Sequence, residues 1–142
     1  MLSDRLNGKE RRAYVRLNTA LTVRFRFSGD QPDKAYIATI NNISHGGLRI
    51  EVPKNQKQLI EKLSATRENS SIKIEASILN SGVEFFAKPA WINCRLNWAK
   101  KPNNKNPVLL AGIAFNNLNE DTKKQLHDYI VGEFVKHYDK AV

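Results

Sequence analysis

The stretch LTVRFRF, residues 21–27, decides the fold class of this chain. Its leucine, valine and two phenylalanines stand at every second position, and a threonine and two arginines stand between them. A period of two residues is typical of a β-strand with one buried face. Similar segments predict five further strands, at residues 35–40, 48–52, 72–78, 83–99 and 108–115. Pro89 is expected to bend the segment 83–99 or to mark a sheet edge. The predicted fold class is therefore mainly β.

Two segments have a pattern other than that of a strand. Residues 55–67 are predicted to form a short helix or a polar loop. Near the C-terminus, apolar residues recur every three or four positions from Leu126 to Tyr138, which predicts an amphipathic helix over residues 119–139. Asn119 is its expected N-cap, followed by two acidic residues where the helix dipole favours negative charge. About six strands and a closing helix indicate a small antiparallel barrel with the helix against it.

Length, charge and cysteine content exclude several classes of protein. The chain has 142 residues, enough for one domain, and its net charge of +9 favours a partner that carries phosphates or other anions. Cys94 is the single cysteine, so no internal disulfide can form. No apolar run approaches the roughly 20 residues that span a bilayer, and the N-terminus lacks the apolar stretch of a signal peptide. We expect a cytoplasmic domain without a membrane span.

The sequence contains no recognisable catalytic or metal-binding pattern. His127 and His137 lie ten residues apart on the predicted final helix, which is not the spacing of a metal-binding pair, and we expect both to face solvent. Cys94 shares a strand face with Ile92, which indicates a buried thiol with no neighbouring base. Glycine-rich phosphate-binding loops are missing. We therefore expect no enzyme and no bound metal.

A basic segment, RRAYVR at residues 11–16, precedes the first long strand. Arg11, Arg12 and Arg16 stay charged, and each guanidinium can donate two parallel hydrogen bonds to a phosphate. The same group can pair with the O6 and N7 acceptors of guanine or stack on a purine. Basic N-terminal arms are common, so this segment alone does not define a function.

The segment NISHGG, residues 42–47, lies at the tight connection between two predicted strands. Asn42 and Ser44 have short polar side chains that can cap backbone groups or contact a ligand. The glycines permit a close approach of the backbone to a neighbour. Taken alone, the segment favours an ordinary hairpin turn with Asn42 and Ser44 as local caps.

Together the two segments resemble the signature of the PilZ domain family, R-x-x-x-R followed by [D/N]-x-S-x-x-G. The first half runs from Arg12 to Arg16 and the second from Asn42 to Gly47. Residues 96–98 and 112–115 also resemble the family pattern. The resemblance implies a six-stranded antiparallel β-barrel with a C-terminal α-helix and a flexible N-terminal arm. The expected division is an arm over residues 1–17, which carries R-x-x-x-R, and a barrel domain over residues 18–142.

The resemblance also implies a ligand, because PilZ domains are bacterial receptors for the second messenger cyclic di-GMP. Arg12 and Arg16 would grip its phosphates and guanine, while Asn42 and Ser44 would contact a guanine and its ribose. Asn42 stands where many members have Asp, so the site offers no negative charge to the guanine N–H edge, and affinity could be lower. The expected ligand-binding residues are Arg11, Arg12, Arg16, Asn42, Ser44, Gly47 and Trp98.

Three of these residues carry finer expectations. Gly47 would keep the turn tight. Arg11 directly precedes R-x-x-x-R, and members with an arginine there tend to bind two intercalated ligand molecules, so we expect two ligands per site. Trp98 either stacks near the ligand or only packs on the barrel.

The expected mechanism is ordering of the N-terminal arm. The dianionic ligand would bridge the arm to the barrel and create a surface for a protein effector, for example of the flagellar, exopolysaccharide or pilus machinery. Motility and biofilm formation are the processes implied, and neither a nucleic-acid partner nor a membrane span is expected. Two alternatives stay open: a barrel that binds single-stranded nucleic acid without sequence preference, and a PilZ-like adaptor that binds no nucleotide.

Overall fold

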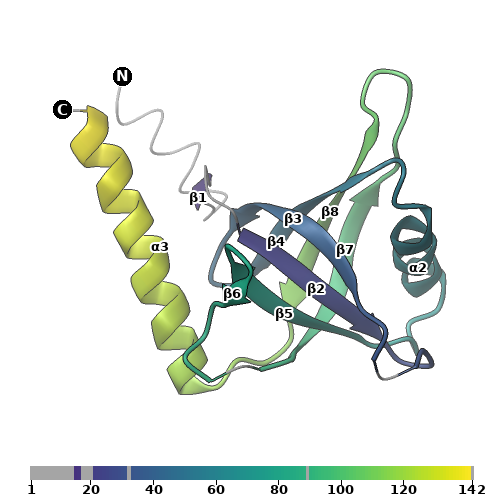
Figure 1. Cartoon of the computed structure of the whole chain (residues 1–142), viewed down its shortest axis with the longest axis horizontal. Helices are drawn as coiled ribbons and strands as arrows, with labels where there is room; N and C mark the ends of the chain where they lie inside the picture. Colours follow the sequence, from purple (N-terminus) through teal and green to yellow (C-terminus); the bar gives the residue numbers. More distant parts are fainter. Residues whose placement is uncertain (1–14, 17–20, 32, 89, 142) are drawn as a thin grey trace.

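The computed structural model describes residues 15–16, 21–31, 33–88 and 90–141, without the side chains of residues 15–16 and 137–141. Within these residues the chain forms a curved antiparallel sheet and two helices (Figure 1). The elements in chain order are β1 (Val15–Arg16), β2 (Leu21–Phe27), β3 (Tyr36–Ile43), β4 (Gly47–Pro53), α2 (Lys57–Glu68), β5 (Ile74–Asn80), β6 (Val83–Glu84), β7 (Ile92–Lys100), β8 (Val108–Phe115) and α3 (Glu120–Ala141).

Six of the described strands close into a barrel. Neighbouring strands follow the order β3, β2, β5, β7, β8, β4, and pairing of β3 with β4 completes the ring. All pairs are antiparallel, and β1 and β6 are short additions to β3 and β5. Closure leaves the long strands without a free edge. The predicted six-stranded antiparallel barrel with a C-terminal helix is confirmed.

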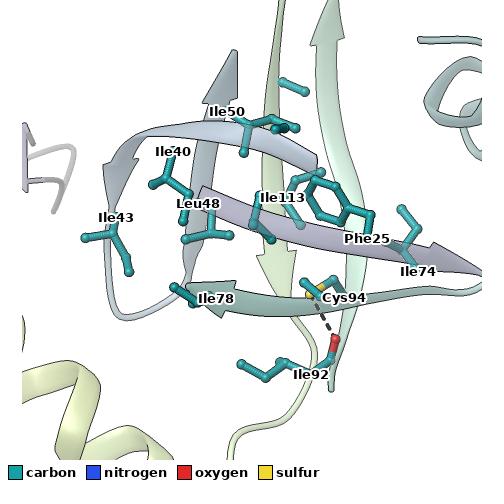
Figure 2. Close-up of a cluster of buried hydrophobic side chains, with 14 of the residues drawn as sticks. Phe25, Ile40, Ile43, Leu48, Ile50, Ile74, Ile78, Ile92, Cys94 and Ile113 are labelled. Carbon is teal, nitrogen blue, oxygen red and sulfur yellow. Dashed lines mark hydrogen bonds between the residues drawn. The ribbon is translucent and has the colours of Figure 1, made fainter. Parts of the chain in front are cut away.

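The barrel interior is filled by the apolar face of each strand (Figure 2). β2 follows the predicted alternation, with Leu21, Val23 and Phe25 fully buried and the residues of the opposite face, which include Arg24 and Arg26, half-buried. β4 and β8 contribute Leu48 and Ile113 to the same core. Each such side chain stabilises the fold by about 1.5–3 kcal/mol through burial alone.

The two helices lie at different ends of the barrel (Figure 1). α2 buries Leu59 and Leu63 against the core, so the segment predicted as a helix or a loop is a helix. α3 begins after the predicted N-cap, because the Oδ1 of Asn119 accepts the backbone N–H of Thr122 at 2.8 Å. Its first half packs on the barrel and its second half runs along the side of the molecule. Neither of the described helices is long and apolar enough to cross a membrane.

Residues 83–99, predicted as one long strand with a bend or an edge at Pro89, form two separate strands. β6 ends at Glu84, and the chain leaves the sheet until β7 begins at Ile92. Two consecutive phenylalanines explain the break, since neighbouring strand residues point to opposite faces and only one of them could reach the core. Phe86 enters the core, while Phe85 packs edge-on against Tyr129 of α3 with 4.9 Å between ring centroids.

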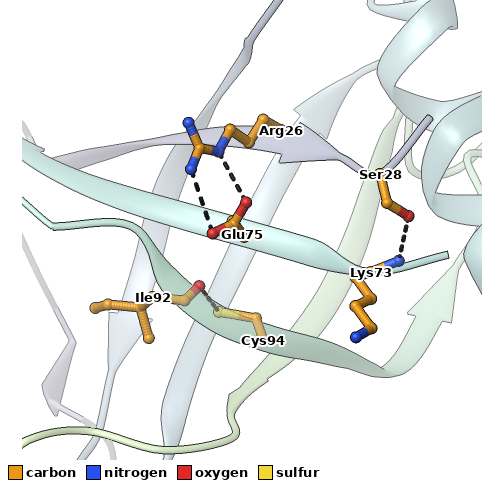
Figure 3. Close-up of polar contacts among 6 residues, drawn as sticks. All are labelled: Arg26, Ser28, Lys73, Glu75, Ile92 and Cys94. Atoms are coloured by element: carbon orange, nitrogen blue, oxygen red, sulfur yellow. Dashed lines mark hydrogen bonds and ion pairs between the residues drawn. The ribbon is translucent and has the colours of Figure 1, made fainter. Parts of the chain in front are cut away.

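Ion pairs lie on the outer face of β2 and β5. Arg26 donates from Nε and Nη2 to the two carboxylate oxygens of Glu75, at 2.9 and 3.3 Å (Figure 3). Its guanidinium also lies 4.2 Å from the ring centroid of Trp91. Arg24 similarly pairs with Glu84 at 2.6 Å. These pairs fix the positions of the two arginine side chains on the outer face of the barrel.

The Cys94 thiol is buried as predicted, and we expect it to be unreactive in the folded protein. Its Sγ lies 3.2 Å from the carbonyl oxygen of Ile92, and burial, helped by the charge of Glu75, raises the pKa of the thiol to about 12. At pH 8 its thiolate fraction is then about a thousandfold below that of an exposed cysteine. Ellman's reagent should label the native protein far more slowly than the protein in guanidinium chloride. Comparable rates in the two states would contradict this assignment.

Candidate functional site

The predicted N-x-S-x-x-G segment forms the turn between β3 and β4. Asn42 is still part of β3, Ser44 begins the turn, and Gly47 opens β4. The backbone N–H of Ser44 donates to the carbonyl of Gly47 at 2.9 Å, and the Ser44 Oγ accepts the N–H of Gly46 at 3.2 Å. Ser44 is almost fully buried, so its hydroxyl holds the turn together. Its predicted contact with a ligand stays a prediction.

A β-bulge just before this turn orients Asn42. In the register of β3 with β4, Ile40 faces Ile50 and Asn42 faces Arg49, which leaves Asn41 as the extra residue. Asn41 is held there by its Nδ2, which donates to a carboxylate oxygen of β4 at 3.0 Å. The extra residue reverses the alternation. Ile43 therefore reaches the core, and Asn42 lies on the outer surface, half-buried.

A second bulge orients Trp98 on β7. Leu96 pairs with Ile113 and Trp98 pairs with Gly112, so Asn97 is the extra residue. Without this bulge Trp98 would continue the inward face of the strand. Instead its side chain is 40% exposed and lies on the outer surface of the barrel.

Trp98 lies directly over Gly112. A Cβ atom at Gly112 would be 2.7 Å from Cε2 and 2.8 Å from Cδ1 of the indole, closer than real side chains approach. The ring can occupy this place only because residue 112 is glycine. On the neighbouring strand, the guanidinium carbon of Arg49 lies 5.7 Å from the centroid of the Trp98 ring. The distance is within the range of a cation–π contact.

The strand registers bring the two halves of the predicted motif into one row. Arg16 of β1 pairs with Asn42, Asn42 pairs with Arg49, Arg49 pairs with Gly112, and Gly112 pairs with Trp98. Residues directly opposite each other on antiparallel strands share a face and lie about 5 Å apart at Cβ. Predicted ligand residues separated by more than 80 positions therefore follow one line across five strands. Arg16 is placed in this row by the pairing of its backbone with that of Asn42.

A second row runs beside the first and carries another cation. Gly47 pairs with Ala114, and Ala114 pairs with Arg95 of β7. Arg95 is exposed and donates to the Oδ1 of Asn116 at 2.8 Å. The described members of the two rows include no acidic residue, which makes this surface suitable for an anionic or electron-rich ligand.

The structure does not describe the whole predicted site. Arg11 and Arg12 lie outside the described residues, as does most of the predicted arm over residues 1–17. Val15 and Arg16 are the described part of the arm, and they pair with β3 as β1. Among the described residues, no group of three or more potential ligands could hold a metal ion.

Sequence reasoning missed two features of this region. The first is Arg49, which stands two residues after Gly47 between inward-facing apolar residues, so the alternation alone predicts that it faces outward. The second is a contact between the turn and α3, in which the Nε2 of His45 lies 2.9 Å from the Nδ1 of His127. One ring donates and the other accepts. Both histidines are exposed, and the pair connects the predicted ligand segment to the C-terminal helix.

The strand pairings define a closed β-barrel with a polar surface beside the β3–β4 turn. The model of the PilZ domain matches residues 10–132, and the chain belongs to the PilZ domain family. This match confirms the resemblance seen in the sequence. A comparison with curated protein sequences gave no match.

Several solved structures share the fold. K. pneumonia MrkH in its apo state matches with a TM-score of 0.64 and 12% identity, over 89% of this chain and 50% of MrkH. Borreliella burgdorferi PlzA in complex with c-di-GMP matches with a TM-score of 0.52 and 17% identity, over 94% of this chain and 58% of PlzA. Bacillus subtilis MotI/DgrA, an inhibitor of motility, has a TM-score of 0.54 and 12% identity, over 89% and 52%. This chain thus spans about half the length of these proteins.

Proposed function

We propose that this protein is a cytoplasmic receptor for cyclic di-GMP that acts through a protein effector and catalyses no reaction. The observation that carries the proposal is the register of Arg16 with Asn42, which joins the R-x-x-x-R and N-x-S-x-x-G segments on adjacent strands. Family membership supports it, as do the similar structures of MrkH and PlzA, which were solved in complex with c-di-GMP. The proposed contacts are those of Arg11, Arg12, Arg16, Asn42, Ser44, Gly47 and Trp98.

Each proposed contact follows from the chemistry of the side chain. Arg12 and Arg16 would donate paired hydrogen bonds to phosphate or to guanine, and Arg11 would add a charge that favours two intercalated ligands. Asn42 would offer an amide to a guanine edge. Trp98, exposed and flat over Gly112, would supply a stacking surface, because a base–aromatic stack contributes about 1–3 kcal/mol.

The experiment that tests this function compares cyclic di-GMP with a single-stranded oligonucleotide at two salt concentrations. A receptor of the proposed kind binds the dinucleotide tightly and the oligonucleotide weakly. A general nucleic-acid barrel, the alternative favoured by the charge of +9, binds any oligonucleotide with a steep dependence on salt. An adaptor without nucleotide binds neither ligand. The last two results would each overturn the proposed function.

The proposed mechanism is ligand-dependent ordering of residues 1–17. Cyclic di-GMP would bridge Arg12 and Arg16 to the barrel surface beside β4, and the arm would then present a new surface to the effector. β1 lies next to α3, and the pair of His45 with His127 also reaches this helix, so the effector surface would include α3. The similarity to MotI/DgrA supports motility as one process that such an effector serves.

Amide hydrogen exchange checks this mechanism directly. Saturating ligand is expected to slow exchange in residues 5–17 by tenfold or more, because bound phosphates would fix the backbone around Arg12 and Arg16. Residues in the core strands should be affected much less. Unchanged exchange in residues 5–17 at saturation would refute the ordering mechanism while leaving ligand binding itself in place.

A further inference from the structure

Arg49 differs from every other arginine whose side chain the structure describes, because it donates to no hydrogen-bond acceptor among the described residues. Its Nε is buried and has no partner among the described residues. The same is true of the Nε of Arg24, but Arg24 donates through Nη2 to Ser77 and Glu84. The Nη atoms of Arg49 also donate to no described acceptor, so their N–H groups are free to bind an acceptor that a ligand brings. The other described arginines all donate to a carboxylate, hydroxyl, amide or backbone oxygen: Arg24, Arg26, Arg67 and Arg95.

The surroundings of Arg49 hold its guanidinium beside two predicted ligand residues. Asn42 is its register partner on β3, and Trp98 lies across Gly112 on the other side. The guanidinium carbon of Arg49 lies 5.7 Å from the centroid of the indole, within the range of a cation–π interaction. The guanidinium of Arg49, the amide of Asn42 and the indole of Trp98 thus lie next to one another on the outer surface of the barrel.

We infer that Arg49 selects guanine at this site, an assignment that rests on the proposed function. Guanine presents two acceptors, O6 and N7, on one edge, and its N1–H and N2–H₂ donors on the adjoining edge. Arg49 donates to O6 and N7, while the Oδ1 of the neighbouring Asn42 accepts from the donor edge. Adenine carries an amino group in place of O6. This group is a hydrogen-bond donor, so it cannot accept a hydrogen bond from Arg49.

This role also accounts for a site without an acidic residue in its described rows. Asn42 supplies no charge to the guanine donors, whereas the hydrogen bonds from Arg49 are charge-assisted. Guanine binding therefore depends more on the hydrogen bonds from Arg49 to O6 and N7 than on those from the guanine donors to Asn42. A variant without Arg49 should bind the guanine ligand more weakly and should distinguish less well between guanine and adenine.

The chain contains a matched control for the contact of Arg49 with Trp98. Arg26 lies 4.2 Å from the ring centroid of Trp91, but its Nε and Nη2 already donate to the carboxylate of Glu75 (Figure 3). Arg26 is on β2 and Trp91 directly precedes β7, and neither residue belongs to the two rows. It has the same residue types and the same kind of ring contact, but its arginine is already paired with a carboxylate.

The test is calorimetric titration of full-length wild type, Arg49→Met, Arg49→Lys and Arg26→Met with cyclic di-GMP and with cyclic di-AMP. We expect wild type to prefer cyclic di-GMP, and Arg49→Met to lose about tenfold or more of this affinity with little change for cyclic di-AMP. Arg49→Lys should recover only part of the preference, because an ammonium cannot donate as a planar fork. Arg26→Met should bind as wild type does, and thermal melting checks that each variant is folded.

The possible results separate this inference from the function on which it rests. If wild type binds cyclic di-GMP and Arg49→Met keeps both affinity and preference, the assignment of Arg49 is wrong, but the proposed function as a cyclic di-GMP receptor is retained. If Arg49→Met weakens both dinucleotides equally, Arg49 contacts phosphate, and its role in selecting guanine is overturned. If wild type binds neither dinucleotide, both the proposed function and this inference are wrong.

Discussion

Replacement of Gly47 by alanine is expected to lower the midpoint of thermal unfolding by on the order of 10 °C and to abolish ligand binding. A Cβ atom at this position would overlap the carbonyl oxygen of Ile113 and lie 3.0 Å from the Cα of Ala114. Both atoms belong to the backbone of β8, so the clash can be relieved only by separating β4 from β8. Overpacking of this kind costs up to about 3 kcal/mol, which corresponds to the expected shift in a chain of this size.

The neighbouring glycine provides the control. A Cβ at Gly46 would meet nothing closer than the Ser44 Oγ at 3.9 Å, so Gly46→Ala should melt within a few degrees of wild type. Melting curves of the two variants, recorded side by side, check the prediction. Equal stability of Gly47→Ala and wild type would show that the close approach of β4 and β8 is not required.

Replacement of Gly112 by alanine should leave the barrel folded but weaken cyclic di-GMP binding by about tenfold or more. The added Cβ meets the indole of Trp98 rather than the backbone. Because Trp98 is 40% exposed, the ring can turn outward at little cost to the fold. It then loses its contact with Arg49 and can no longer stack in its present position, which removes a contribution of about 1–3 kcal/mol.

Titration with cyclic di-GMP measures this loss, and melting curves confirm that the fold is retained. Gly132→Ala is the matched control, because a Cβ at this exposed helical position meets nothing within 4 Å. It should bind as wild type does, and alanine should favour the helix by up to about 1 kcal/mol. Unchanged binding in Gly112→Ala would exclude Trp98 from the ligand surface.

The barrel itself could be predicted because its strands obey simple periodicity. The alternation in residues 21–27 and 48–52 corresponds to buried and half-buried positions in the structure. Prediction failed where a strand departs from that period, as at the pair Phe85 and Phe86. There the demand for burial on two faces breaks the strand.

The site was harder to predict, because two bulges create it. Strict alternation would turn Asn42 and Trp98 toward the core, but the extra residues Asn41 and Asn97 turn both outward. Nothing in a local pattern of polar and apolar residues marks a bulge. The motif indicated Asn42 as a ligand residue, whereas the meeting of Asn42 with Trp98 around Arg49 required the pairing of strands distant in sequence.

The most direct test of the central claim is calorimetric titration of cyclic di-GMP into wild type and into the double variant Arg12→Ala/Arg16→Ala. The account predicts binding in wild type, with two ligand molecules per protomer, and loss of binding in the double variant. A wild-type stoichiometry near one would refute the role given to Arg11. Absence of binding in wild type, or full binding in the double variant, would contradict the account of this protein as a receptor that grips its ligand through the R-x-x-x-R segment.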